Sequence, residues 1–369
     1  MLVALAAAGL VAAGLGLIAL GLAQDQPPAA PLAAAPPAAV SAATVVPLAP
    51  ALGAVKPEPL LELAGFHPGA VVHDVVTKVR RMHAIRLAAM RQPHTKPRST
   101  VSLYEHSVRR STLRAQGCSA ARRGVGGIVI LDFGQPAYNG HTYGTYLFSG
   151  RFAGNKAITR ALFAYAVGYH RCLRRGSKLK ISLARGTSNY HPQVPSAYQA
   201  GKRWARETHT LQRLVEARGL GAHVTAAAAD DVEPAWDRSF HRTRDFFRGY
   251  RDAQFGHVLY NFGSLDGGVG SVWNARQAFY VASGMRYVVA IPEIYNRSMA
   301  EQWAELAHIA KHRYHRPLKF AGVMTQHTSS NHATKPRDAH KMLVRALAHV
   351  GGMAVAEVPP TLTNIHSAE

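Results

Sequence analysis

Apolar, β-branched runs recur six times after Gly124, and segments with helical periodicity separate them. Strands that alternate with helices in this way predict a parallel sheet with crossover helices. A closed eight-unit barrel needs two more strands, for which Ser99–Leu103 and Met353–Val358 are candidates. We therefore predict an α/β fold of the (β/α)8-barrel type, irregular or incomplete if those two strands are not formed, with an open doubly wound sheet as the alternative. The six runs are Ile128–Leu131, Leu179–Leu183, Val224–Ala229, Val258–Tyr260, Tyr287–Ile291 and Phe320–Met324.

The first 124 residues differ in composition from the rest of the chain and divide into three segments. Residues 1–23 are almost wholly apolar, which predicts a signal peptide or a membrane anchor, although no Lys or Arg precedes Lys56. Residues 24–59 are rich in Ala and Pro and predict a disordered tether. Residues 60–124 form a basic segment, with an amphipathic helix expected at Val71–Arg91. The barrel domain is then predicted at 125–352, followed by a tail at 353–369.

The charge balance limits the classes of partner. Lys and Arg number 43 against 21 Asp and Glu, and the formal net charge of +22 favours an anionic partner. The sequence contains no RNP, helix-turn-helix or zinc-finger motif, so we expect no specific nucleic acid. We expect the protein to be secreted or associated with the cell envelope, where a polysaccharide or another anionic cell-wall polymer would be its partner. Residues 1–23 would provide any membrane attachment.

Cysteine and histidine give no pattern typical of a metal site. The two cysteines, Cys118 and Cys172, are too few for a zinc site built on thiolates. In an oxidising compartment they would form a disulfide, and two separate buried thiols are the alternative. The 20 histidines include no HExxH motif, and those that follow predicted strands, such as His141 and His191, lack ligand spacing. We expect no metal and no cofactor.

Acidic residues gather where the predicted strands end. The carboxyl ends of the strands in a parallel barrel meet at one face, and such enzymes assemble their active sites there. Acids scattered over the surface would not be expected to follow strands in this way. This distribution is the best evidence for chemistry in the sequence. The acids at or just after strand ends are Asp132, Asp230, Asp231, Glu233, Asp266 and Glu293.

Two of these acids have the spacing that places both on one face of a strand. Asp231 and Glu233 are two residues apart, whereas Asp230 points the other way and is a candidate for a structural role. A pair of carboxyl groups is suited to cleavage of a glycosidic bond. The protonated acid donates its proton to the leaving oxygen, and the ionised acid stabilises the positive charge that develops on the sugar. The alternative for each acid is an ordinary one, as a helix cap or an arginine partner.

Aromatic and amide side chains follow the same strand ends. The flat apolar face of an aromatic ring can line a sugar-binding groove, and amides can hydrogen-bond to sugar hydroxyls. Each such residue taken singly is more often a packing residue than a ligand contact. Our candidate substrate-binding residues are Tyr138, Tyr190, Trp236, Tyr260, Asn261, Asp266, Tyr295 and Gln326.

Two short stretches resemble a known family. GIVILDFGQPAYNG (Gly127–Gly140) and ADDVEP (Ala229–Pro234) are similar to motifs of the lysozyme-type family 25 glycoside hydrolases and of related exported bacterial barrels. The resemblance implies cleavage of peptidoglycan glycan strands, with Glu233 as acid/base and with Asp231 and Asp132 tuning it or stabilising the intermediate. The late-strand Asp of that family has no counterpart here, and Glu293 is a candidate to replace it. Much of the remaining barrel resembles exported barrels without an assigned activity.

A non-catalytic wall-binding barrel is the main alternative function. Basic charge, a tether and an aromatic groove would serve adhesion as well as hydrolysis. The environment of Glu233 distinguishes the two, because a bidentate arginine partner would keep this carboxyl ionised and remove the proton donor. A second carboxylate facing Glu233 favours hydrolysis. A spacing of about 5 Å is then typical of a retaining pair and one of about 6.5–9.5 Å of an inverting pair.

Overall fold

The computed structural model describes most of the chain from residue 98 onward. The predicted signal or anchor segment (1–23), the tether (24–59) and the helix at Val71–Arg91 lie outside the described residues. Within the described part, no helix combines the length and the apolar character needed to cross a bilayer. The described residues are 98–253, 255–327, 333–352 and 356–368.

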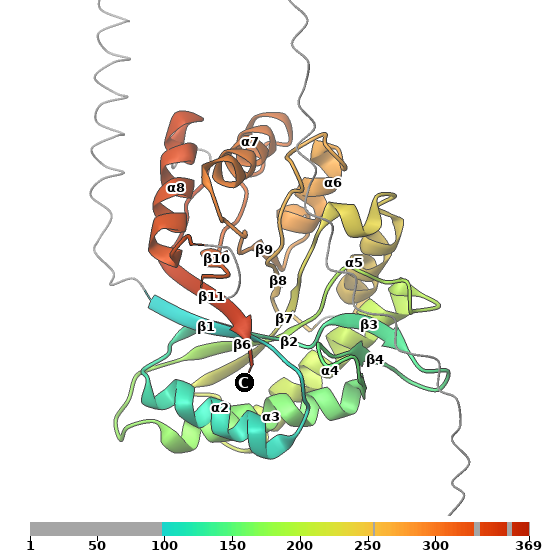
Figure 1. Cartoon of the computed structure of the whole chain (residues 1–369), viewed down its shortest axis with the longest axis vertical. Coiled ribbons are helices and arrows are strands. Elements are labelled where there is room, and N and C mark those ends of the chain that lie inside the picture. The colour runs from blue at the N-terminus through green and yellow to red at the C-terminus, as the bar shows by residue number, and fades with distance from the viewer. Residues whose placement is uncertain (1–97, 254, 328–332, 353–355, 369) are drawn as a thin grey trace, which may run out of the picture. The chain divides into compact units, whose positions relative to one another are not determined.

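Eight parallel strands form one curled sheet (Figure 1). The strand order is β10-β11-β1-β2-β6-β7-β8-β9, and every ladder in it is parallel. Residues in and beside the two outer strands, β9 and β10, are joined by two isolated bridges, Ala290 with Phe320 and Glu293 with Met324. No ladder between β9 and β10 is described, so the sheet does not close a full (β/α)8 barrel. The strands are β1 (Arg98–Tyr104), β2 (Gly127–Asp132), β6 (Ile181–Gly186), β7 (Val224–Asp230), β8 (Leu259–Asn261), β9 (Val288–Ala290), β10 (Val323–Thr325) and β11 (Thr361–Ser367).

The sheet extends beyond the predicted domain limits of 125 and 352. Strand β1 confirms the candidate at Ser99–Leu103 and lies between β2 and β11. The last strand, β11, begins at Thr361 and not within Met353–Val358, of which residues 353–355 are not described. Thr and Ser alternate with apolar residues in both strands, and Thr100 and Thr363 are buried with their hydroxyl oxygens 2.8 Å apart. These polar positions weaken the apolar pattern of both strands, so β1 was only a candidate and the bounds predicted for the last strand were wrong.

The described residues contain seven α-helices, and their apolar faces pack on the strand faces that point away from the sheet's interior (Figure 1). The interior face is a separate cluster built from strand residues and neighbouring loop residues, among them Ile130, Ala227 and Phe262. Ser196 caps α4 by accepting a hydrogen bond from the Gln199 amide. The helices are α2 (Arg110–Arg122), α3 (Asn155–Cys172), α4 (Ala197–Ala217), α5 (His241–Ala253), α6 (Ala275–Phe279), α7 (Arg297–Arg313) and α8 (Pro336–His349).

A disulfide joins α2 to α3, which decides between the two possibilities for the cysteines. Cys118 is bonded to Cys172, 54 residues along the chain. The two helices approach closely at Gly117, where an added Cβ would lie 2.1 Å from the carbonyl oxygen of Tyr165. A glycine is therefore required at this crossing, and the covalent bond holds the same pair of helices together.

A small antiparallel sheet follows β2 and was not predicted from the sequence. It consists of β3 (Gln135–Tyr138), β4 (Tyr143–Tyr146) and β5 (Phe152–Gly154). A backbone hydrogen bond from Tyr138 to the carbonyl oxygen of Gln193 ties it to the loop after β6. The small sheet therefore lies beside the loop that carries several of the candidate site residues.

Candidate active site

Three carboxyl groups meet at the carboxyl ends of the strands. Asp231 and Glu233 follow β7, and Glu293 follows β9. One carboxylate oxygen from each lies within 4.8 Å of the others. Three of the four residues that we predicted as catalytic from their positions at strand ends therefore lie close together. We call Asp231, Glu233 and Glu293 the carboxylate cluster.

The backbone at Asp231 and Glu233 is fixed by the segment that follows β6. The Asp231 amide donates to the carbonyl oxygen of Thr187 at 2.7 Å, and the Asn189 amide donates to the carbonyl oxygen of Asp231. The Asn189 side chain is fully buried and makes two hydrogen bonds to the Glu233 backbone. Its Nδ2 donates to the Glu233 carbonyl oxygen and its Oδ1 accepts from the Glu233 amide, both at 3.0 Å. Asn189 therefore positions Glu233 from behind.

The Glu233 carboxyl group is held by a serine. The backbone amide of Ser264 donates to Oε1 at 3.1 Å, and Ser264 Oγ donates to Oε2 at 2.6 Å. Asp266, in a left-handed backbone conformation (φ 45°), lies beside the same serine, with Oδ1 3.1 Å from Ser264 Oγ. The Asp266 Oδ2 accepts a hydrogen bond from the Ala235 amide, which anchors the turn after Glu233.

Ion pairs between described residues all lie at the surface, and none of them includes a member of the carboxylate cluster. The described groups that hydrogen-bond to the Glu233 carboxyl group include no arginine, so the partner that would have kept this carboxyl ionised is not among them. Burial raises the pKa of Glu233 well above its usual range, and a hydrogen bond with Asp266 and the charge of Glu293 raise it further. These neighbours therefore favour the protonated form of Glu233 more than water would for an exposed glutamate.

The other two carboxyl groups also have raised pKa values. Burial is the largest cause for Asp231, followed by the charges of Glu293 and Glu233. Burial raises the pKa of Glu293 to about 7, against hydrogen bonds from Tyr295 and Gln326 that lower it. Because these groups interact, their protons are lost in steps that belong to the cluster and not to one residue.

Tyr104, at the end of β1, faces the cluster and was missed by the sequence analysis. The Gln326 Nε2 donates to the Tyr104 hydroxyl oxygen and lies 3.5 Å from Glu293 Oε1. Burial raises the pKa of Tyr104, and the charges of Glu293 and Asp231 contribute to the same shift. Tyr104 ends its strand as the other site residues do, and the same rule would have found it had β1 been assigned firmly.

Asp132 lies at the end of β2, close enough to affect the cluster through its charge. Its Oδ1 accepts a hydrogen bond from the Gly134 amide at 3.0 Å. Burial raises the pKa of Asp132 to about 7, and this hydrogen bond opposes the shift. Asp132 contributes to the raised pKa of Asp231, but it is not within the group of oxygens that approach to 4.8 Å.

Two exposed aromatic rings follow the same strand ends. Trp236 lies three residues after Glu233, and its ring centroid is 6.5 Å from that of Tyr190 in an edge contact. The side chains are 37% and 44% exposed, unusual for large aromatic residues in this structure. The two rings form an exposed aromatic pair in the segments that follow β6 and β7, and their role in substrate binding stays a prediction.

Three predicted substrate-binding residues have their polar groups engaged elsewhere. The Tyr138 hydroxyl donates to the Gly140 carbonyl within the small sheet. Tyr260 lies in the interior cluster and its hydroxyl reaches Ser182 in β6. Asn261 donates to the carbonyl oxygen of Val281, in the helical layer. A side chain at a strand end can point inward or toward the helices as well as to the mouth, so position at a strand end does not by itself fix what a side chain contacts.

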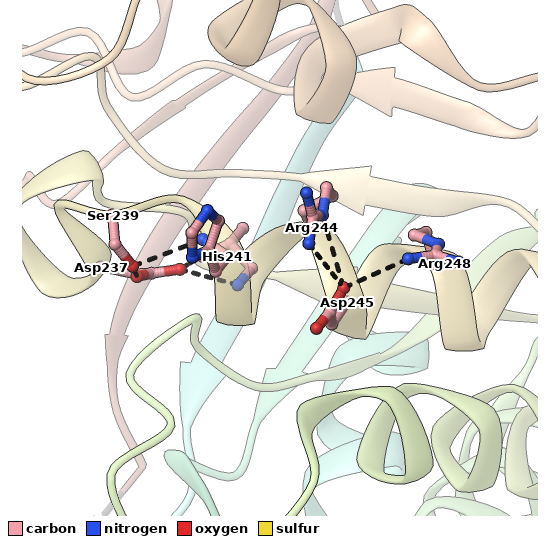
Figure 2. A network of polar contacts seen from close by, with 7 residues as sticks. Asp237, Ser239, His241, Arg244, Asp245 and Arg248 are labelled. Carbon is pink, nitrogen blue, oxygen red and sulfur yellow. Dashed lines mark hydrogen bonds and ion pairs between the residues drawn. The ribbon is translucent and has the colours of Figure 1, made fainter.

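The turn after Glu233 leads into α5 through a capping network (Figure 2). Asp237 Oδ2 accepts from the amide and the hydroxyl of Thr243, at 2.8 and 2.9 Å, and Asp237 Oδ1 accepts from Ser239. Farther along the helix, the side chain of Asp245 pairs with Arg244 and Arg248 at the surface. This cap fixes where the segment carrying Glu233 joins the helical layer.

A pocket of about 430 Å³ lies at the other end of the strands. It is lined by Tyr250, Tyr280 and the residues from Gly284 to Val288, which lead into the amino end of β9. Glu293 follows the carboxyl end of that same strand, so this pocket is not the carboxylate site. Parallel barrels use the amino ends of their strands for stability and not for catalysis.

No protein-family model matches this chain, and no curated protein matches it. The functional argument therefore rests on the site, because a fold of this class hosts many unrelated activities.

Proposed function

We propose that this protein is an exported glycoside hydrolase of barrel type that cleaves peptidoglycan glycan strands by carboxylate acid/base catalysis. The observation that carries the proposal is the approach of the Asp231, Glu233 and Glu293 oxygens to within 4.8 Å. This spacing is near the separation of about 5–5.5 Å between the carboxyl groups of retaining enzymes and below the 6.5–9.5 Å of inverting ones.

Each carboxyl group has a role in this proposal. Glu233 is the acid/base that protonates the leaving oxygen, since burial and its neighbours favour its protonated form. Glu293 is the nucleophile, because Tyr295 and Gln326 provide hydrogen bonds that favour its ionised form. Asp231 and Asp132 adjust the proton affinity of this pair through their charges.

Non-catalytic binding of a wall polysaccharide is the second candidate. Asp231 and Glu293 are only 8% and 4% exposed, which favours a site closed to a long glycan. The basic chain and the exposed Tyr190–Trp236 pair would suit adhesion to an anionic polymer. Both candidates place the protein outside the cytoplasm or in the cell envelope.

Clearance of a purified peptidoglycan suspension tests the first proposal. The active form needs Glu293 ionised and Glu233 protonated, so the rate rises with pH as Glu293 ionises near pH 7 and falls again as the raised pKa of Glu233 is passed. We expect a bell-shaped profile with its acidic limb near pH 7, measured as turbidity loss between pH 5 and 10. No clearance at any pH, or an optimum near pH 4, would contradict the proposal.

Trp236→Ala is expected to weaken glycan binding without changing the chemical step. Loss of an aromatic contact with a sugar ring corresponds to an increase in KM of up to about tenfold, with kcat unchanged. Phe255→Ala is the matched control, because Phe255 is an exposed aromatic residue (55%) that stacks on His209. Steady-state kinetics on soluble glycan fragments measure both constants. An equal effect of the two substitutions would contradict a contact between Trp236 and the glycan.

A further inference from the structure

The carboxylate cluster places three acidic groups in a buried position, and none of the described ion pairs gives them a cationic partner. Asp231, Glu233 and Glu293 converge from two strand ends, and Asp132 lies close enough to act on them electrostatically. The ion pairs between described residues leave these acids out. Buried charges in proteins are generally paired with an opposite charge or bound to a metal ion.

An unsatisfied oxygen points to the second of these solutions. Asp231 is only 8% exposed, and its Oδ1 is buried without a hydrogen-bond partner among the described residues. The charges of Glu293 and Glu233 both act on the Asp231 carboxyl group, so its neighbours in the cluster are acidic as well. A buried acceptor without a donor costs free energy, and a cation held between the three carboxyl groups would satisfy it.

The ligand type and spacing identify the class of ion. Carboxylate oxygens are hard ligands that suit Ca²⁺, Mg²⁺ and Mn²⁺. Two ligands of one ion can be no farther apart than twice the metal–oxygen distance, which is about 4.6–5.2 Å for Ca²⁺ and about 4.0–4.2 Å for Mg²⁺. The three oxygens lie within 4.8 Å of one another, which a Ca²⁺ ion can span. Mg²⁺ keeps several water ligands and is usually bound by only one or two carboxylates, so three converging carboxyl groups favour Ca²⁺.

We propose that Asp231, Glu233 and Glu293 bind one Ca²⁺ ion. Water or glycan hydroxyls would complete the six to eight oxygen ligands that Ca²⁺ takes. A bound Ca²⁺ ion would contact Glu233 in its ionised form. Glu233 would then have no proton to donate to the leaving oxygen of the glycan. This consequence, inhibition of hydrolysis by Ca²⁺, rests on the proposed function, whereas the binding itself does not.

Calorimetric titration of CaCl₂ into the full, chelator-treated chain tests the binding. We expect one site in the wild type, at least tenfold weaker Ca²⁺ binding in Asp231→Asn, and at least tenfold weaker binding of Mg²⁺ by the wild type. Asp245→Asn is the matched control, because Asp245 is an exposed acid paired with Arg244 and Arg248 on α5. Glu293→Gln provides a second site variant, and circular dichroism establishes that each variant is folded.

Absence of Ca²⁺ binding by the wild type would overturn the proposal, as would unchanged binding in folded Asp231→Asn and Glu293→Gln. Addition of Ca²⁺ to the peptidoglycan clearance assay separates this inference from the proposed function. Ca²⁺ binding without clearance in either condition supports the ion site and contradicts the hydrolase. Clearance by a chain that binds no Ca²⁺ supports the hydrolase and contradicts the ion site.

Discussion

Glu233→Gln is expected to lower kcat for hydrolysis of a natural glycan by about 10³-fold while leaving the fold intact. General acid catalysis contributes about 10²–10⁴-fold to such reactions, and an amide cannot donate the required proton. The substitution keeps the shape of the side chain, and Ser264 retains an oxygen to donate to. Thermal melting checks the fold, and Asp245→Asn serves as a control for loss of an acid elsewhere.

The leaving group separates the roles of Glu233 and Glu293. An aryl glycoside with an acidic phenol needs no proton when its bond to the sugar breaks, so Glu233→Gln should still release phenol in a rapid first turnover. Glu293→Gln removes the nucleophile and is expected to abolish release from both types of substrate. Rapid-mixing kinetics with the two substrates measure this contrast. Equal losses on both substrates for both variants would contradict the assignment of roles.

Loss of the Cys118–Cys172 disulfide is the largest expected effect on stability. Closing a loop of 54 residues corresponds to about 4 kcal/mol of unfolding free energy in the chain-entropy account. For a domain of this size the midpoint of thermal unfolding should fall by about 10 °C. Calorimetry of the double variant Cys118→Ser, Cys172→Ser against the wild type measures the shift, and treating the wild type with reductant should reproduce it.

An unchanged melting temperature in the double variant would show that α2 and α3 need no covalent link. The tight crossing at Gly117 provides a comparison, because Gly117→Ala forces apart the same two helices without touching the disulfide. We expect this variant to be destabilised in both the oxidised and the reduced protein. Equal stability of Gly117→Ala and wild type would contradict the close approach of the helices.

The sequence predicted the sheet and the cluster because both depend on local patterns. Apolar runs identified most strands, and acids at their ends identified Asp231, Glu233 and Glu293. Parallel strands bring their carboxyl ends to one edge whatever the details of packing, so this inference needed no knowledge of tertiary contacts. The strands β1 and β11 were harder to recognise because buried hydroxyl pairs such as Thr100–Thr363 interrupt their apolar pattern.

The directions of side chains and the contacts that support the site could not be predicted from the sequence. Tyr260 and Asn261 lie at a strand end, but one side chain points into the sheet's interior and the other contacts the helical layer. Their alternation could be read from the sequence only after the register of β8 was known. The hydrogen bonds from the Asn189 side chain to the Glu233 backbone join residues 44 positions apart, and no local sequence pattern predicts such a contact.

Counting new reducing ends in purified peptidoglycan tests the central claim most directly. Scission of a glycosidic bond creates one reducing end per event, whereas adhesion to the wall creates none. With the calcium-free wild type near neutral pH we expect reducing ends to accumulate with time, and Glu233→Gln to leave their number at the level of untreated wall. Wild-type protein that binds the wall and yields no new reducing ends would contradict the hydrolase and leave a wall-binding barrel.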